Sequence, residues 1–276
     1  MTNAVAVSGA FDDLRSAQVR FLQEAARLGP VHVLLWSDEQ VQAHAGRPPK
    51  FPAEERRYLL EALRYVDRVT VPTAAFDPDT LPDAERPAAG WWAVGEAEDS
   101  PGKRAFAAAH GLEHRVVRSG ELRGFPAGPP EAVGPLSGGP RRKVILTGCF
   151  DWFHSGHVRF FEEASAFGDL YVVVGHDANV RLLKGLGHPL FPQEERRYLV
   201  QAVRHVRQAL VSSGAGWLDA EPEIQALRPE IYIVNEDGDK PEKRAYCEAN
   251  GIEYVVLMRK PKEGLPCRQS TDLRGY

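Results

Sequence analysis

Two histidines flank a serine–glycine pair in the segment from Thr147 to His157, which reads TGCFDWFHSGH. His154 and His157 lie three residues apart, after a short apolar run and at the start of a stretch with helical periodicity. The first turn of a helix offers free backbone N–H groups and partial positive charge, and both attract phosphate. Gly156 lets a ligand approach the backbone closely. These residues predict a cradle for a polyphosphate; the alternative is that the two histidines are merely structural.

The scaffold around this segment occurs twice in the chain. Residues 9–25 and 148–164 are identical at 9 of 17 positions, and residues 51–66 and 191–206 are identical at 11 of 16. The two matches keep their order and nearly the same offset, so the chain is a duplicated domain. A stretch rich in proline and glycine separates the copies and is typical of a linker. The predicted parts are a domain over 1–125, a linker over 126–140 and a domain over 141–276.

The two copies differ where chemistry would be done. In the first copy, the two histidines and the glycine between them are replaced by Arg15, Gln18 and Ala17. The surrounding apolar positions are kept, so the first copy should still fold. We therefore interpret the histidines of the second copy as functional. The first copy is predicted to be degenerate and non-catalytic, serving as a scaffold or as the half that forms a homodimer.

Strand and helix signals alternate along the second copy. Apolar runs predict strands at 143–147, 170–174, 231–234 and 253–258, and helical spacing predicts helices at 157–167, 194–209 and 240–250. This alternation is typical of a parallel sheet covered by helices. The predicted fold class is α/β, with two tandem Rossmann-like doubly wound domains. Ligands of such folds bind beyond the carboxyl ends of the strands, where the strand order reverses.

Three motifs of the second copy resemble those of the cytidylyltransferases in the HxGH nucleotidylyltransferase superfamily. They are the HxGH segment ending at His157, Lys184 with the Glu-Glu-Arg helix that follows it, and Arg268 to Leu273, a shortened form of R-x-x-x-S-T-T/S-x-L. The motifs occur in family order and span most of 143–276. The tandem build with one degenerate copy is similar to ethanolamine-phosphate cytidylyltransferases, in which the intact copy usually comes first.

The resemblance implies transfer of a nucleoside monophosphate, with CMP from CTP favoured, to a phosphate monoester with release of pyrophosphate. It implies that His154 and His157 stabilise charge in the transition state, that Lys184 reaches the α-phosphate and the co-substrate, and that Arg268 binds the leaving phosphates. Further residues implied in nucleotide binding are Gly148, Cys149, Phe150, Asp151, Gly156, Asn235, Asp237, Ser270 and Thr271. Asp151 would also support the histidine loop. Two alternatives stay open: an adenylyltransferase that uses ATP, and a nucleotide-binding regulatory protein without turnover.

Two further features of the second copy call for an interpretation. Glu195 and Arg196 recur unchanged in the first copy as Glu55 and Arg56, which favours a structural role for them. The loop 214–219 contains two glycines and a tryptophan, and is a candidate contact for the co-substrate.

Composition limits the partners. The formal net charge is −4, which argues against binding of nucleic acid through a basic surface. The three cysteines form no disulfide framework and no zinc motif, so no protein metal cluster is predicted. Mg²⁺ is expected as cofactor because reactions of triphosphates need a cation that bridges their negatively charged oxygens. No leader and no apolar run of membrane-spanning length are recognised, so a cytoplasmic protein is expected. The expected partners are a nucleoside triphosphate, with CTP favoured, and a phosphorylated alcohol or sugar.

Overall fold

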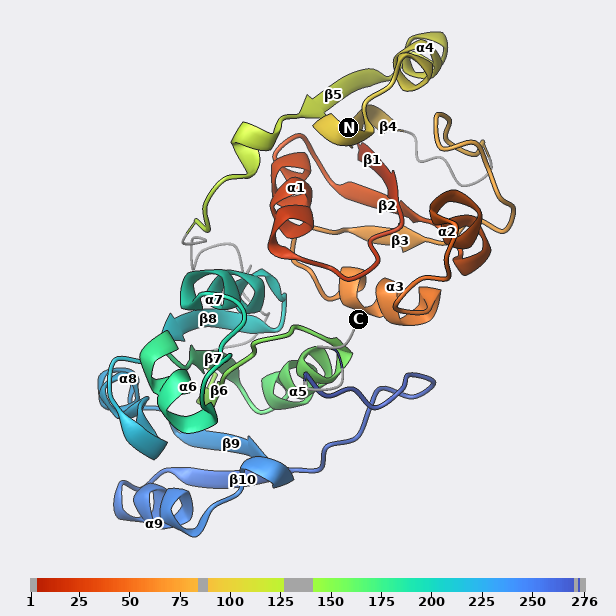
Figure 1. Ribbon diagram of the computed structural model, residues 1–276. Helices are drawn as coiled ribbons and strands as arrows, with labels where there is room; N and C mark the ends of the chain where they lie inside the picture. The colour runs from red at the N-terminus through yellow and green to blue at the C-terminus, as the bar shows by residue number, and fades with distance from the viewer. Residues whose placement is uncertain (1–3, 84–88, 127–140, 271–272, 274–276) are drawn as a thin grey trace. The chain divides into compact units, whose positions relative to one another are not determined.

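The computed structural model describes residues 4–83, 89–126, 141–270 and 273. The chain forms two compact units, Met1–Gly124 and Phe125–Tyr276, each with its own sheet (Figure 1). Apart from Pro126, the predicted linker over 126–140 lies outside the described residues.

Each unit alternates strands with helices. The elements of the first unit are β1 (Ala4–Gly9), α1 (Ser16–Ala26), β2 (Val31–Leu35), α2 (Asp38–Ala45), α3 (Ala53–Glu61), β3 (Arg68–Thr70), β4 (Ala89–Gly95), η1 (Glu96–Glu98), α4 (Pro101–Ala109), β5 (Glu113–Val117) and η2 (Ser119–Leu122). Those of the second unit are β6 (Lys143–Gly148), α5 (Ser155–Ser165), β7 (Asp169–Val174), α6 (Asp177–Lys184), α7 (Gln193–Ala202), β8 (Val206–Val211), η4 (Gly216–Leu218), α8 (Glu221–Leu227), β9 (Ile231–Asn235), η5 (Glu236–Gly238), α9 (Pro241–Ala249) and β10 (Glu253–Leu257).

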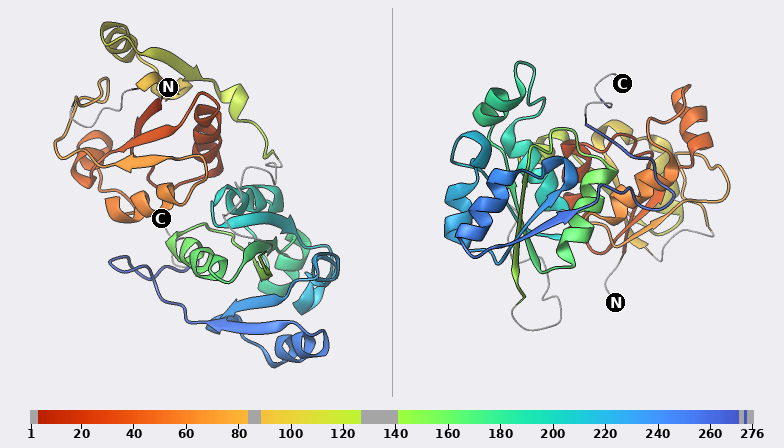
Figure 2. Two further views of the ribbon diagram at one scale, coloured as in Figure 1. Left: turned by 180° about the vertical axis from the view of Figure 1, so that it is seen from behind. Right: turned by 90° about the horizontal axis from the view of Figure 1, so that it is seen from below.

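The two sheets have the same topology. The strand orders are β3-β2-β1-β4-β5 and β10-β9-β6-β7-β8, and every pairing is parallel. The first strand of each unit is therefore central, and the order reverses beside it. Helices cover both faces of each sheet (Figure 2). The prediction of two tandem doubly wound α/β domains is confirmed.

The core of the second unit explains why these runs form buried strands. Val144, Ile145 and Leu146 in the central strand are fully buried, as is expected when helices cover both faces of a parallel sheet. On one face, Ile145 belongs to a cluster that includes Ile224 of α8 and Cys247 of α9. Helices α5 and α7 pack against β7. Helices thus pack against both faces of the sheet whose strands carry the site.

One predicted helix is too long. A helix over 194–209 was expected from its apolar spacing, but α7 ends at Ala202 and β8 begins at Val206. Val203 caps the helix with an extended backbone, and the side chain of Gln201 accepts a hydrogen bond from the backbone N–H of Ala209 at 2.8 Å. The β-branched residues here serve helix spacing and strand alternation equally well, so spacing alone gave the wrong boundary.

In the part of the chain that the structure describes, no helix combines the length and the apolar character needed to cross a bilayer.

Candidate active site

The reversal of strand order in the second unit lies between β6 and β9. The chain leaves β6 at Gly148 and reaches the first turn of α5, which carries both histidines. The chain leaves β9 at Asn235 and forms the turn η5. Because parallel strands end at the same edge of a sheet, the two connections border one crevice, where ligands of doubly wound folds bind.

The two imidazoles of this crevice stack on one another. The ring centroids of His154 and His157 are 3.9 Å apart, with an angle of 24° between the ring planes. His154 is the N-cap of α5, and its Nδ1 accepts a hydrogen bond from the backbone N–H of Gly156 at 3.1 Å. His154 Nε2 and His157 Nδ1 are buried and have no hydrogen-bond partner among the described residues. Buried polar atoms are rarely left unpaired, so these two nitrogens point to a missing ligand.

Burial and nearby cations keep both imidazoles neutral. Burial, together with the charges of Arg259 and Arg268, lowers the pKa of His154 to about 3. The pKa of His157 lies well below its ordinary value because of burial, and then because of His154, Arg259 and Lys184. Three cationic side chains from separate segments therefore act on one pair of rings. An incoming polyanion would find neutral N–H donors and three positive charges.

The backbone at the start of α5 leaves room only for small residues. A Cβ on Gly156 would lie 2.9 Å from His154 Cε1 and 3.5 Å from the backbone oxygen of Arg268. A Cβ on Gly148 would lie 2.6 Å from the ring of Phe150, which has a positive φ of 51°. The Phe150 ring in turn meets the His157 ring edge-on, with centroids 5.2 Å apart. Both glycines thus allow the aromatic packing that orients the histidines.

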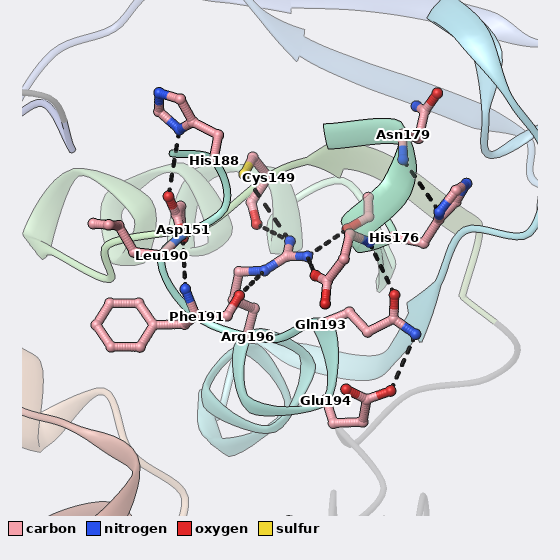
Figure 3. A network of polar contacts seen from close by, with 12 residues as sticks. Cys149, Asp151, His176, Asn179, His188, Leu190, Phe191, Gln193, Glu194 and Arg196 are labelled. Carbon is pink, nitrogen blue, oxygen red and sulfur yellow. Dashed lines mark hydrogen bonds and ion pairs between the residues drawn. The ribbon is translucent and has the colours of Figure 1, made fainter. Parts of the chain in front are cut away.

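Asp151 ties the histidine loop to the loop before α7. Its Oδ1 accepts hydrogen bonds from the backbone N–H groups of Leu190 at 2.7 Å and Phe191 at 3.1 Å, and its Oδ2 lies 3.5 Å from His188 Nδ1 (Figure 3). Asp12 makes the same pair of backbone contacts in the first unit, with Lys50 and Phe51. The first unit makes this contact without the histidines. The aspartate at this position therefore anchors a loop in both units, as Asp12 in the first and Asp151 in the second.

Arg196 holds three segments together beneath the site. Its guanidinium is fully buried and donates to the backbone oxygens of Phe191, Cys149 and Gly175 at 2.9, 2.6 and 2.8 Å, and to Asp177 Oδ1 at 2.6 Å (Figure 3). Cys149 therefore takes part in this site through its backbone, and burial raises the pKa of its thiol.

The first unit contains the same arginine network. Arg56 bonds Phe51, Ala10 and Asp38 in the same manner as its counterpart bonds the second unit. The contacts give this arginine a structural role in both units.

Lys184 and Arg268 belong to segments that are far apart in the sequence. Lys184 is the last residue of α6, and Gly185, which follows it, has a positive φ of 85°. Lys184 is exposed, it makes no hydrogen bond or ion pair among the described residues, and its charge acts on His157. The backbone of Arg268 lies beside the first turn of α5. Ser270 donates to the backbone oxygen of Trp152 at 3.2 Å, which holds the C-terminal segment against the histidine loop. Thr271 lies outside the described residues.

A surface pocket opens beside the first turn of α5. Its lining includes Gly156, Asn235, Arg259 and Arg268, so the ends of β9 and β10 meet the histidine loop there. Asp237 is exposed and pairs with Arg259 at 2.6 Å. The pocket therefore brings together two predicted residues, Asn235 at the end of β9 and Arg268 of the C-terminal segment, while Asp237 lies outside its lining.

Arg259 is the main site residue that the sequence analysis missed. Its Nη2 donates to the backbone oxygen of Arg268 at 3.2 Å, and its charge lowers the pKa of both imidazoles. The available signal was its place directly after β10, at the edge of the sheet where ligands bind. Its counterpart in the first unit is Ser119: both backbone N–H groups bond the glutamate that begins the preceding 3-10 turn.

The equivalent place in the first unit is filled by an internal ion pair. The side chain of Arg15 occupies the N-cap of α1 and lies 2.8 Å from Asp13 Oδ1, while Lys50 lies 3.0 Å from Asp13 Oδ2. The two cations thus already have an anionic partner. The first unit has neither stacked imidazoles nor a counterpart of the C-terminal arginine segment among its described residues.

The carboxylates around the site are already engaged. Asp151 accepts two backbone N–H groups, Asp177 pairs with Arg196, and Asp237 pairs with Arg259. Within the described ranges, no group of three or more histidine, cysteine or acidic side chains could hold a metal ion. The site therefore fits a divalent ion carried mainly by phosphate oxygens and water, which is the usual state of Mg²⁺ at triphosphates.

Comparison with known proteins finds a family model that matches the second unit. The cytidylyltransferase-like family model matches residues 145–257. The FAD synthase of Ferroglobus placidus is 34% identical over 125 residues, which are 44% of this chain and 78% of the synthase. The bifunctional protein HldE of Methylococcus capsulatus is 38% identical over 104 residues, which are 37% of this chain and 21% of HldE.

A solved structure shows a more distant likeness. The lipopolysaccharide core biosynthesis protein of Thermoplasma volcanium GSS1 has a TM-score of 0.38 and 23% identity over 45% of this chain and 99% of that one, too distant to bear on function. The match to the synthase covers more than two thirds of that protein, and the family model covers the segment with the histidines and β9. The chain belongs to the cytidylyltransferase-like family and is a nucleotidyltransferase.

Proposed function

We propose that the second unit transfers a nucleoside monophosphate from a nucleoside triphosphate to a phosphate monoester and releases pyrophosphate. One observation carries this proposal: two stacked, neutral imidazoles present buried unpartnered nitrogens at the sheet edge, and three cationic side chains act on them. Such an arrangement suits a ligand with several adjacent negative charges.

The reaction consists of one displacement at the α-phosphorus. An oxygen of the acceptor phosphate attacks, the bond from the α-phosphorus to the bridging oxygen breaks, and pyrophosphate leaves with the charge of that oxygen. Neutral His154 and His157 donate hydrogen bonds to the transferring group without the cost of desolvating a charge. Arg259 and Arg268 neutralise charge on the leaving phosphates, and Lys184 aligns the acceptor phosphate with the triphosphate.

Mg²⁺ accompanies the triphosphate in this proposal. When bound, the ion would neutralise negative charge on the phosphates and so reduce repulsion between the two anions. The protein contributes the donors and cations, and no carboxylate of the site is assigned to the ion.

The nucleotide donor that we favour is ATP. FAD contains an adenylyl group joined to a flavin phosphate, and several of the similar curated proteins are FAD synthases. CTP stays the second candidate because the matching family model is described as cytidylyltransferase-like. Asn235 and Met258 line the pocket beside α5 and are the residues that we expect near the base.

We assign the first unit no turnover. Its α1 N-terminus has Arg15 paired with Asp13 in place of the stacked imidazoles, so a phosphate would have to displace an internal carboxylate. The unit keeps the loop anchor and the arginine network, which explains why it folds. We propose that it serves as a scaffold.

Release of pyrophosphate tests the proposal. Each of the four common nucleoside triphosphates is combined with FMN, phospho-alcohols and sugar phosphates, with Mg²⁺ present. We expect turnover with ATP and one acceptor class, and a loss of at least about a hundredfold in His157→Ala, the usual cost of a lost transition-state donor. Gln18→Ala is the matched control in the first unit and should retain full activity. Near-normal turnover in His157→Ala would refute the site, and triphosphate binding without any turnover would favour a regulatory protein.

A further inference from the structure

Large apolar side chains are exposed at one place beside the proposed site. Among the described residues, the exposed large apolar side chains are Phe167, Leu182, Leu183, Leu186, Leu190, Trp217 and Met258. Five of them lie on α6, on the loop that follows it, or on η4, and we call these five the apolar rim: Leu182, Leu183, Leu186, Leu190 and Trp217. Leu186 is 94% exposed and Leu182 is 72% exposed, and exposed apolar side chains that are grouped rather than scattered singly mark binding surfaces.

The rim is built onto the site by named contacts. Asn179 in α6 bonds Gly216 in both directions, at 2.8 and 3.1 Å, which fixes η4 and its tryptophan against α6. His176 Nε2 also lies 2.8 Å from the backbone oxygen of Gly214. At the other end, the backbone N–H of Leu190 bonds Asp151 of the histidine loop (Figure 3). These hydrogen bonds therefore fix the rim to the histidine loop.

A cation sits within the rim. Lys184 follows Leu183 directly and lies two residues before Leu186. Its charge lowers the pKa of His157, and apolar side chains flank it in sequence. A molecule held by both would need an anionic group at one end and an apolar surface next to it. The proposed acceptor has such an anionic group, because it is a phosphate monoester.

The first unit provides an internal comparison. Helices α2 and α6 both end at a glycine with positive φ, so Gly46 corresponds to Gly185. Counting back from these glycines, the places of Leu182, Leu183 and Lys184 hold Ala43, His44 and Ala45 in the first unit. After Gly46, the first unit continues with Arg47, Pro48, Pro49 and Lys50.

The comparison separates the rim from the scaffold. The buried face of the helix is kept, since Val41 and Val180 are both buried at the same place. The outer face and the loop change, as does the buried position held by Gln40 and Asn179, and the first unit contributes no exposed large apolar side chain among its described residues. The leucines thus accompany the histidines and are not required by the fold.

We infer that the acceptor of the proposed reaction is a phosphate monoester with an aromatic or aliphatic body, which the apolar rim covers while Lys184 binds its phosphate. This inference rests on the proposed function and narrows its acceptor. A polyhydroxylated sugar phosphate would place hydroxyl groups against leucine side chains and lose their hydrogen bonds to water. An apolar body would instead bury part of the rim and of itself.

The test compares acceptors with different bodies and one phosphate. Phenyl phosphate and hexyl phosphate are compared with glucose 1-phosphate, using ATP and CTP, and kcat/KM is measured by pyrophosphate release. We expect the apolar acceptors to be at least about tenfold better. The double variant Leu183→Gln/Leu186→Gln should abolish this preference by raising KM for the apolar acceptor, and should leave KM for the triphosphate unchanged. Phe167→Gln, an exposed apolar residue outside the rim, is the matched control and should change neither.

Each other outcome has a distinct meaning. Preference for glucose 1-phosphate, or an unchanged preference in the double variant, would overturn the inference and leave the proposed function standing. A change of molecular mass in the double variant with unaltered kinetics would show that the rim joins two copies of the chain and would also overturn it. Absence of pyrophosphate with every pair of substrates would refute the proposed function itself.

Discussion

The neutral state of His154 predicts a specific dependence of stability on pH. Burial lowers the pKa of this imidazole from 6.5 to about 3 in the folded protein. Below pH 6.5 the His154 imidazole is protonated in the unfolded chain but stays neutral in the folded chain. The free energy of unfolding therefore falls as pH is lowered. Each pH unit between the two pKa values costs about 1.4 kcal/mol, which gives about 2 kcal/mol between pH 6.5 and pH 5.

The variant His154→Asn isolates this contribution. Asparagine is a good N-cap, so it can accept the hydrogen bond from Gly156 that His154 now accepts, but it does not titrate. We expect the wild type to lose about 2 kcal/mol more than the variant between pH 7.5 and pH 5. Histidines elsewhere whose pKa is also lowered, such as His32 and His205, are present in both proteins and cancel in the difference.

Native-state hydrogen exchange measures the effect in the right unit. The two units need not unfold together, so the opening free energies of buried amides in β7 should be followed from pH 7.5 to pH 5 after correction for intrinsic exchange. Parallel profiles for the wild type and His154→Asn would refute the reasoning. So would an NMR titration in which the ring nitrogens of His154 change protonation near pH 6.5.

Three further predictions concern the surroundings of the imidazoles. Arg259→Gln should lower turnover about a hundredfold by removing a cation from the transition state, and should raise the pKa of both imidazoles, as NMR titration can show. Gly156→Ala should lower kcat about tenfold or more, because the new methyl group would displace the His154 ring; Ala17→Gly in the first unit should leave kcat unchanged. Asp151→Asn should destabilise the second unit by about 1–3 kcal/mol in thermal unfolding, since one oxygen there accepts two backbone N–H groups.

Strongly patterned segments were the predictable part of the fold. The apolar run at 143–147 gave β6 within one residue, and the spacing after His157 gave most of α5. Helix α6 was not predicted because it is short and because its N-cap is His176, whose ring accepts from the backbone N–H of Asn179. Histidine is not among the usual capping residues, so no start signal was visible.

The candidate site was predictable where a motif or the internal repeat gave a contrast. The paired histidines differ from their counterparts in the first copy, and Arg196 does not, so one comparison separated chemistry from scaffold. Arg259 lacked such a signal, because a single arginine after a strand is common on any surface. Its relation to the imidazoles depends on how the C-terminal segment returns to α5, which no local pattern encodes.

The buried guanidinium of Arg196 bears on how the duplicated chain could diverge. It binds backbone oxygens, which are present whatever side chains the loops carry, and Arg56 makes equivalent bonds in the other half. Substitutions at the ring-bearing positions therefore leave the clamp intact. After duplication, one half could change at its surface loops and still fold, which is consistent with the proposal that the first unit is a scaffold without turnover.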